Sequence, residues 1–169
     1  RVMLMHRREE ALAYPKGDLR LGFCRACGFI TNVLFDASLN EYSPNFEETQ
    51  HFSPKFDGWA RQLVDRLVRD YDIRGKQVIE IGCGKGEFLS LLCEAGQNHG
   101  LGIDPGCHPG RLPNEGTGPG QVRLIQDLYS MQYANLPADV VACRHTLEHI
   151  APTREFLRTY MKEFHDFVT

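Results

Sequence analysis

Residues 78–86 have the clearest chemical potential in the sequence, because an acid and three glycines follow one another at short spacing. An apolar run, Val-Ile-Glu-Ile, leads into Gly82, Gly84 and Gly86, and Glu80 stands two residues before the first glycine. This pattern predicts a strand that turns sharply into a helix, where the backbone can approach a bound molecule closely. We therefore predict a nucleoside-cofactor pocket in which Glu80 and the turn, with Cys83, contact the ligand.

Two further acids follow predicted strands and would lie at the same edge of a parallel sheet. Asp104 lies 22 residues after Gly82 and precedes Pro105. A carboxylate there can accept hydrogen bonds from both hydroxyls of a ribose. Asp127 and its neighbour Leu128 follow the next strand, where the acid can reach an adenine amino group. Asp-Pro-Gly is also a plain turn, and Asp127 could instead cap a helix.

The spacing of the glycines separates two classes of cofactor. A dinucleotide fingerprint is Gly-x-Gly-x-x-Gly, with a helix N-terminus directed at a pyrophosphate. The present spacing is Gly-x-Gly-x-Gly, and the carboxylate of Glu80 would repel a pyrophosphate. A carboxylate suits a cofactor with a cationic amino-acid end, so we expect S-adenosylmethionine. The alternatives are a dinucleotide and a tight turn that binds nothing.

The elements that position these residues follow from hydrophobic periodicity. Apolar residues at helical spacing predict a helix over 58–73. Strands are expected at 77–81, 100–104, 122–125 and 139–143, with helices at about 86–95 and from Pro152 onward. Residues 106–120 are rich in glycine and proline and predict a loop, whose mobility is left open. This order indicates an α/β fold with a Rossmann-like parallel sheet, preceded by a small irregular N-terminal segment.

Composition limits the classes of partner. The chain has 169 residues, a formal net charge of −3 and no run near the ~18–20 apolar residues that span a bilayer. We expect no binding to nucleic acid or membranes and find no signal peptide. The cysteine usage fits a reducing cytoplasm, with one close pair, Cys24 and Cys27. The oligomeric state is left open.

The chain resembles class I S-adenosylmethionine-dependent methyltransferases, and more narrowly the sugar C-methyltransferases. The segments that carry the resemblance span about residues 10–160. They are Cys-Arg-Ala-Cys-Gly-Phe-Ile-Thr-Asn from Cys24, Tyr-Ser-Pro-Asn-Phe-Glu-Glu-Thr-Gln-His-Phe-Ser-Pro-Lys from Tyr42, the glycine strand 78–89, Gly-Ile-Asp-Pro at 102–105 and Cys-Arg-His-Thr-Leu-Glu-His-Ile at 143–150. The glycine motif is general to class I enzymes, whereas the cysteine pair with Leu-Glu-His-Ile is much more specific.

The resemblance implies a small zinc domain followed by a methyltransferase core and a third domain. On this basis residues 1–57 are expected to be part of the zinc-ribbon-like domain and residues 58–169 the core. We expect a sheet truncated at the C-terminal side, because no later strand closes it. Cys24 and Cys27 would supply half of a four-thiolate zinc site, with the other pair upstream, although His6 is a further candidate.

The resemblance also implies a substrate and a base. In sugar C-methyltransferases the substrate is a nucleotide-linked 4-keto sugar, and a Glu-His pair supplies the base, here Glu148 and His149. His145 is an alternative base, and Tyr42 could supply a phenol where relatives carry a tyrosine before the pair. Histidine suits the task because it titrates near neutral pH. His145 and His149 could instead bind a metal or merely hold a turn.

The remaining predictions concern the approach to the pocket and the rival functions. Arg144 opens the segment that holds the candidate bases and is assigned to the cofactor, while Lys85 is expected to face solvent. Phe52 and Ser53 are expected to touch the cofactor, with a helix N-cap as the equal alternative for Ser53. The rival functions are O- or N-methylation of a small molecule, a cofactor-binding module without catalysis, and an NAD-dependent oxidoreductase.

Overall fold

The computed structural model describes residues 5–39, 49–150 and 153–160. The chain divides into two compact units, Arg1–Glu47 and Glu48–Thr169. The division falls before the expected boundary at 57/58, because residues 49–53 belong with the helix that follows them.

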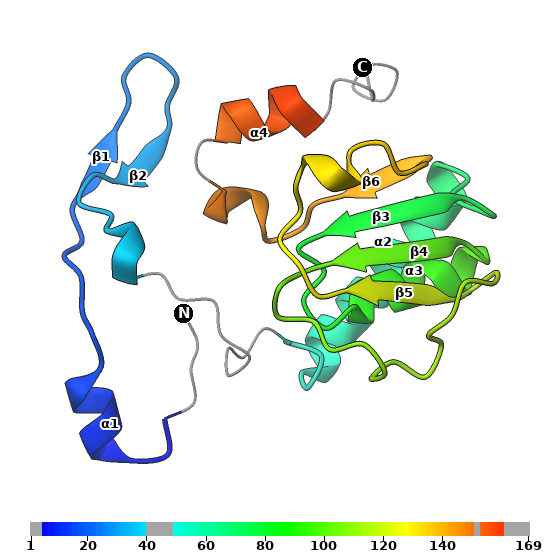
Figure 1. Ribbon diagram of the computed structural model, residues 1–169, viewed down its shortest axis with the longest axis horizontal. Coiled ribbons are helices and arrows are strands. Elements are labelled where there is room, and N and C mark those ends of the chain that lie inside the picture. The colour runs from blue at the N-terminus through cyan, green and yellow to red at the C-terminus, as the bar shows by residue number, and fades with distance from the viewer. Residues whose placement is uncertain (1–4, 40–48, 151–152, 161–169) are drawn as a thin grey trace. The chain divides into compact units, whose positions relative to one another are not determined.

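The first unit contains a small hairpin (Figure 1). Helix α1 (Arg8–Ala13) precedes strands β1 (Leu21–Phe23) and β2 (Ile30–Asn32), which pair antiparallel, and a 3₁₀ turn η1 (Ala37–Leu39) follows. The side chain of Asn32 accepts a hydrogen bond from the Arg20 amide at 2.8 Å and donates one to the Asp18 carbonyl at 3.0 Å. The segment predicted to be irregular therefore holds a short ordered hairpin.

The second unit is built on a four-stranded parallel sheet. Its strands are β3 (Gln77–Ile81), β4 (His99–Ile103), β5 (Val122–Ile125) and β6 (Val140–Ala142), in the spatial order β5-β4-β3-β6. Strand β3 lies between β4 and β6, so the sheet grows in one direction up to β5 and then resumes on the other side of β3. Parallel α/β sheets bind ligands at such a switch, outside the carboxyl ends of the strands. The predicted α/β fold is confirmed.

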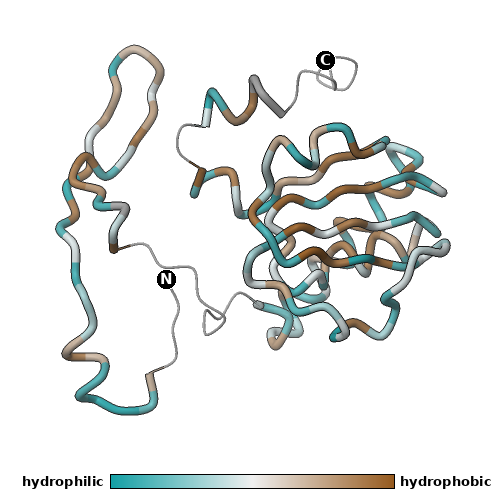
Figure 2. The backbone as a smooth tube through the Cα atoms, viewed as in Figure 1, coloured by the Kyte–Doolittle hydropathy of each residue, from teal (hydrophilic) through white to brown (hydrophobic). Residues whose placement is uncertain are grey.

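Two helices cover one face of the sheet. Figure 1 shows α2 (Pro54–Asp70) and α3 (Glu87–Gly96) together behind the strands. Their buried residues pack against side chains from alternate positions of the strands. Figure 2 shows that the strands are coloured mainly as hydrophobic. The shared core contains Val64, Val68, Val78, Phe88, Leu89, Leu92, Cys93, Val122 and Leu124. Burial on this scale is the main stabilising force of the unit.

The other face of the sheet has its own apolar cluster. Ile79, Ile81 and Ile103 are buried there, and partly buried side chains pack on them from residues 125–143 and from α4 (Thr153–Tyr160). The segment between β5 and β6 includes the 3₁₀ turn η2 (Met131–Tyr133). Because both faces are covered, residues 78–81 of β3 are all buried, which explains the uninterrupted apolar run around Glu80.

The helix boundaries differ from the predictions for local reasons. Helix α2 begins at Pro54 instead of residue 58, because Ser53 caps it and proline is favoured in the first turn. It ends at Asp70, and Asp72 beyond it has a φ of 48°. Helix α3 includes Gly96, and the left-handed residue that ends it is Gln97, with a φ of 51°. The helix stop was thus predicted one residue early.

The loop at 106–120 is tied down by hydrogen bonds within the loop and to the elements around it. The Glu115 carboxylate accepts backbone N–H groups from Gly110, Arg111 and Leu112 at 2.6–2.9 Å. These bonds lower the pKa of Glu115. The Ser90 hydroxyl donates to the side-chain oxygen of Asn114 at 2.8 Å, which ties the loop to α3. These hydrogen bonds therefore fix the conformation of the loop, and several of its glycines lie in turns.

A fully buried amide fixes the connection between α3 and β4. Asn98 is 0% exposed; its side chain accepts from the Lys76 amide and donates to the carbonyls of Ile73 and Leu92, at 2.8–3.1 Å. A buried polar group is tolerated because its hydrogen bonds are satisfied. Across the residues that the structure describes, no helix has both the length and the apolarity needed to cross a membrane.

Candidate functional site

The glycine turn directly follows β3, as predicted. The φ values of Gly82, Gly84 and Gly86 are 69°, 56° and 79°. Residues other than glycine rarely adopt this region of backbone conformation. The Gly82 amide donates to the Ile103 carbonyl at 2.8 Å, and the Gly86 amide donates to the Cys83 carbonyl at 2.9 Å. The turn is therefore fixed against β4 and delivers the chain into α3 at Glu87.

Asp104 is held against this turn. One carboxylate oxygen accepts the Gly84 amide at 3.0 Å, and the other accepts the Gly106 amide at 2.6 Å. Asp104 thus makes the Asp-Pro-Gly turn and also faces the glycine loop, and its contact with a ribose remains a prediction. Each oxygen keeps a second lone pair with which it can accept a hydroxyl. Pro105 is half-buried beside it.

Glu80 is a buried acid whose hydrogen-bonding capacity is only partly satisfied. It is 2% exposed, and its Oε2 atom has no hydrogen-bond partner among the described residues. Burial, opposed by Arg144 and assisted by Asp104, raises the pKa of Glu80 to about 8. A carboxylate of this kind is strongly stabilised when a cation reaches it.

The only cation in contact with Glu80 among the described residues is Arg144, which follows β6. Its Nη1 atom lies 3.8 Å from Glu80 Oε1, beyond hydrogen-bond range. The guanidinium lies over the ring of Phe88, 3.5 Å from the centroid, and 5.9 Å from that of Trp59. Burial lowers the pKa of Arg144. The acid, the cation and two aromatic rings thus meet beside the glycine turn.

Thr146 joins the segment after β6 to the glycine turn. Its hydroxyl lies 3.2 Å from the Gly82 carbonyl and 3.0 Å from the Arg144 carbonyl, and it can donate to either. Strands β3 and β6 are the pair at which the sheet order reverses, so this contact lies at the switch point.

Comparison with models of known protein families identifies the family of the chain. The model of a methyltransferase domain family matches residues 55–164, well over half of the chain. The chain belongs to the methyltransferase domain family. The match supports a class I methyltransferase that uses S-adenosylmethionine and sets aside the oxidoreductase alternative. A search of curated proteins found no match to the chain.

The methyltransferase site fits this cofactor in two respects. First, the orphaned Oε2 of Glu80 provides an acceptor for a cation such as the ammonium group of the cofactor. Second, the turn needs its glycines: a Cβ atom on Gly82 would lie 2.7 Å from the Cβ of Thr146 and closer still to its Oγ1. Gly86 is buried, and a Cβ there would come within 2.9 Å of Leu112. Glu80, Asp104 and the glycine turn are the residues that would hold the cofactor.

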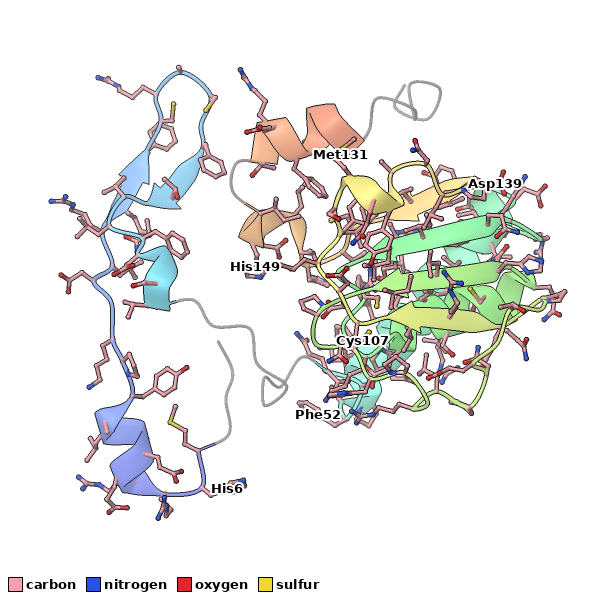
Figure 3. The ribbon with its side chains drawn as sticks, in the orientation of Figure 1. His6, Phe52, Cys107, Met131, Asp139 and His149 are labelled. Atoms are coloured by element: carbon pink, nitrogen blue, oxygen red, sulfur yellow. The ribbon has the colours of Figure 1, made fainter. Side chains whose placement is uncertain are left out.

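Cys83 and Lys85 lie between the glycines of the turn, and neither is fully exposed. Cys83 is half-buried, and a hydrogen bond with Cys107 together with burial raises the pKa of its thiol. Figure 3 places Cys107 at the arrowhead end of the strands. Cys83 therefore stays a neutral thiol. Lys85 is half-buried, which corrects the prediction that it faces solvent.

The predicted bases lie on the segment that Thr146 anchors. His145, Glu148 and His149 are exposed, and the last two belong to the 3₁₀ turn η3 (Leu147–His149). Figure 3 shows the His149 side chain pointing away from the strands. His145 has a φ of 52°, an uncommon conformation for a residue with a side chain. Tyr42 lies outside the described residues.

Asp127 is engaged by its own neighbours. Its carboxylate accepts the Tyr133 hydroxyl at 2.6 Å, the Gln132 amide at 2.8 Å and the Leu128 backbone N–H at 2.8 Å. These bonds lower the pKa of Asp127. They organise the turn before β6, and contact with an adenine remains a prediction. Leu128 is 64% exposed.

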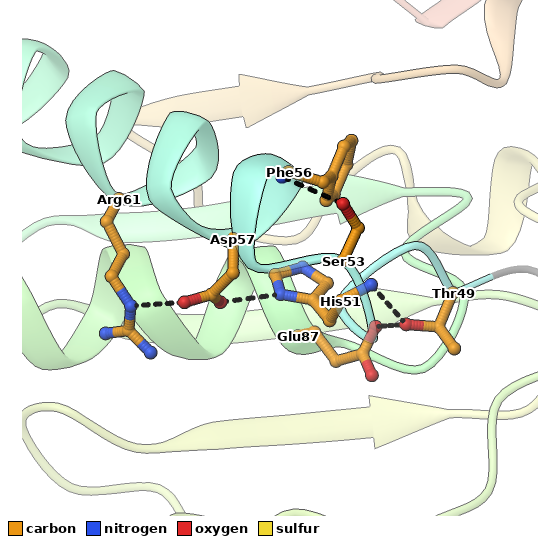
Figure 4. Close-up of polar contacts among 7 residues, drawn as sticks. All are labelled: Thr49, His51, Ser53, Phe56, Asp57, Arg61 and Glu87. Atoms are coloured by element: carbon orange, nitrogen blue, oxygen red, sulfur yellow. Dashed lines mark hydrogen bonds and ion pairs between the residues drawn. The ribbon is translucent and has the colours of Figure 1, made fainter.

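The segment that approaches α2 forms a polar chain to α3, which Figure 4 shows. The Thr49 hydroxyl donates to Glu87 at 2.6 Å, next to the glycine turn, and also accepts the His51 amide at 3.2 Å. His51 Nδ1 lies 3.0 Å from Asp57, which also accepts a bond from Arg61 at 2.8 Å. Hydrogen bonds from Arg61 and His51 lower the pKa of Asp57.

Ser53 and Phe52 do not share that chain. The Ser53 hydroxyl accepts the Phe56 amide at 3.4 Å, so the N-cap alternative holds for Ser53. Phe52 is 78% exposed, and its contact with the cofactor remains a prediction. The polar chain and Thr146 were missed from the sequence. Only the Thr-x-His spacing beside a helix N-cap could have suggested the polar chain.

The cysteine pair of the first unit sits at the tip of the hairpin. Cys24 and Cys27 are exposed, and the Gly28 amide donates to the Cys24 carbonyl at 2.8 Å. Hydrogen bonds from Cys27 and the Ala26 amide lower the pKa of Cys24, which favours the thiolate that binds metals. The structure, as far as it is described, groups no three metal-ligating side chains. The pair and His6 do not form a metal site by themselves.

Proposed function

We propose that this methyltransferase domain methylates carbon next to the ketone of a small molecule, of the nucleotide-linked keto sugar class. The observation that supports the proposal is the bond between Thr146 and the Gly82 carbonyl at 3.2 Å. It holds the segment with Glu148 and His149 beside the turn that would bind the cofactor. A substrate on this segment would therefore lie next to the methyl group. The cytoplasm is the compartment we propose.

Carbon methylation requires a proton to leave the carbon beside the ketone. In the proposal, the His149 imidazole takes this proton, while Glu148 orients the imidazole and offsets its developing positive charge. Both side chains are exposed and accessible to a substrate. When bound, S-adenosylmethionine supplies an electrophilic methyl group on sulfur. The contribution of the protein is to hold the carbon in line with that group.

The proton-transfer step can be tested without methyl transfer. The protein is mixed with S-adenosylhomocysteine and a nucleotide-linked 4-keto sugar in D₂O, and exchange of the hydrogen beside the ketone is followed by NMR. His149→Asn is expected to slow exchange by roughly 100-fold or more, because general-base catalysis is worth that much. His145→Asn is the matched control and is expected to leave exchange nearly unchanged.

Other outcomes reassign the chemistry. Loss of exchange in His145→Asn alone would move the base to His145. Methylation of an acceptor without any exchange would support transfer to oxygen or nitrogen. Cofactor binding with neither exchange nor transfer to any acceptor would support a binding module.

We also propose that Cys24 and Cys27 supply two ligands of a structural zinc site. The proposal is supported by their place at a hairpin tip and by the lowered pKa of Cys24. Two thiolates do not close a structural zinc site, so the other ligands would come from outside the described part of this unit. Metal analysis of a chain extended upstream is expected to find one zinc per chain. Cys24→Ser should remove it, and unchanged zinc content in that variant would refute the assignment.

A further inference from the structure

We infer that Arg144 selects ligands that carry a complete α-amino acid, by pairing with the ligand carboxylate while Glu80 pairs with the ligand ammonium. In the free protein the cation that faces Glu80 among the described residues is Arg144, at 3.8 Å. The inference rests on binding of S-adenosylmethionine at this site and assigns a role to a residue beyond the glycine turn.

The first support is the state of Glu80. Its side chain is 3% exposed, and Oε2 is buried without a partner among the described residues. Its other oxygen faces Arg144 at 3.8 Å, a distance that allows attraction but no hydrogen bond. A buried carboxylate with an unused oxygen requires a donor, and an ammonium group offers three N–H bonds.

The second support is the state of Arg144. Its side chain is 21% exposed, and its guanidinium rests on Phe88 with Trp59 nearby. Among the described residues, no hydrogen bond to its N–H donors accompanies these ring contacts. A guanidinium has five donors in a planar fork that matches a carboxylate, so it is held in position by the rings with its donors free.

Glu80 and Arg144 together form an incomplete pair at the switch point, because burial disfavours the charge on the acid and the contact is too long for a hydrogen bond. An α-amino acid carries an ammonium and a carboxylate on the same carbon, and it can satisfy both partners at once. The ligand then replaces one long contact by two hydrogen-bonded ion pairs in a partly buried site, where such pairs are strongest. A nucleoside without the amino acid leaves Glu80 and Arg144 as they are in the free protein.

The backbone around Arg144 need not move for this exchange. Thr146 ties the segment to Gly82, so the change is confined to the Arg144 side chain. Trp59 is the single tryptophan of the chain and lies 5.9 Å from the guanidinium. We therefore expect its fluorescence to change when Arg144 moves.

The test compares three ligands by calorimetry on the full chain. The ligands are S-adenosylhomocysteine, 5′-methylthioadenosine, which lacks the amino acid, and decarboxylated S-adenosylmethionine, which lacks only the carboxylate. Arg144→Met keeps the packing of the side chain on the rings and removes the charge. This substitution is expected to weaken the binding of S-adenosylhomocysteine by roughly 10- to 100-fold. Binding of the other two ligands should stay within about twofold of the unmodified protein.

Controls separate this role from a structural one. Arg144→Lys should recover part of the affinity, and Arg74→Met, at a surface ion pair, should change none of the three affinities. S-adenosylhomocysteine should alter Trp59 emission in the unmodified protein and much less in Arg144→Met. Equal weakening of all three ligands, or unchanged binding of S-adenosylhomocysteine, would overturn the inference. Failure of the unmodified protein to bind S-adenosylhomocysteine would overturn cofactor binding itself.

Discussion

Glu80→Gln is expected to lose most of its affinity for S-adenosylhomocysteine, by roughly 100-fold, while its free form gains stability at pH 8 relative to the parent protein. The loss follows because a neutral amide cannot balance the ligand ammonium. The gain follows because the parent protein holds a buried acid whose pKa is raised to about 8. Calorimetry measures the first effect, and thermal unfolding across a pH series measures the second.

The sign of the pH effect follows from the two states of Glu80. In the unfolded chain the carboxyl ionises near its ordinary pKa of 4.5, whereas in the folded protein it stays protonated up to about pH 8. Its contribution to stability is thus fully present below pH 4.5 and is lost between pH 4.5 and 8, at up to about 1.4 kcal/mol per pH unit. At pH 7 the cost is about 3 kcal/mol, as an order of magnitude.

Ligand binding has the opposite pH trend. A cationic ligand favours the carboxylate of Glu80, so affinity for S-adenosylhomocysteine should rise from pH 6 to pH 8, and the rise should vanish in Glu80→Gln. Glu94→Gln is the matched control, because Glu94 is an exposed acid on α3. A constant stability difference between Glu80→Gln and the parent protein from pH 5 to pH 8 would contradict the account.

Gly82→Ala is expected to lower the free energy of unfolding by about 2–4 kcal/mol and to abolish measurable binding of S-adenosylhomocysteine. Two effects combine: the φ of 69° strains any side chain, and the added Cβ would collide with Thr146. The collision would push the segment with Arg144 away from the turn. Urea unfolding and calorimetry measure the two losses.

Gly75→Ala separates strain from collision. Gly75 has a similar φ of 61°, but a Cβ there would meet nothing within 4 Å. We expect it to cost about 1 kcal/mol and to leave cofactor affinity unchanged. If Gly82→Ala behaved like Gly75→Ala, the contact between Thr146 and the glycine turn would not support the site.

The sheet could be predicted because its strands are short apolar runs with clear stops. Strands at 77–81 and 122–125 were predicted with the observed limits, and β4 and β6 differ by one residue at each end. Periodicity predicts element type well, while the ends of helices depend on caps such as Ser53 and Gln97. The spatial order β5-β4-β3-β6 follows from long-range pairing, which the sequence does not display.

The candidate site was predictable where one motif carries it. Glu80, the glycines and Asp104 lie within one strand-turn-helix unit and the next strand, so their spacing was informative. Thr146 and Trp59 approach this unit from two other segments, and only the fold brings them together with Arg144 and Phe88. Residues 106–120 were predicted as a loop, but composition could not show that Glu115 would pair with backbone N–H groups of that loop.

Calorimetric titration of the chain with S-adenosylhomocysteine is the decisive experiment for the cofactor site. We expect saturable binding of one ligand per chain, loss of that binding in Gly82→Ala, and no heat with NAD. Absence of binding by a folded protein, or saturable binding of NAD in its place, would contradict the claim that Glu80, the glycine turn and Asp104 form an S-adenosylmethionine site.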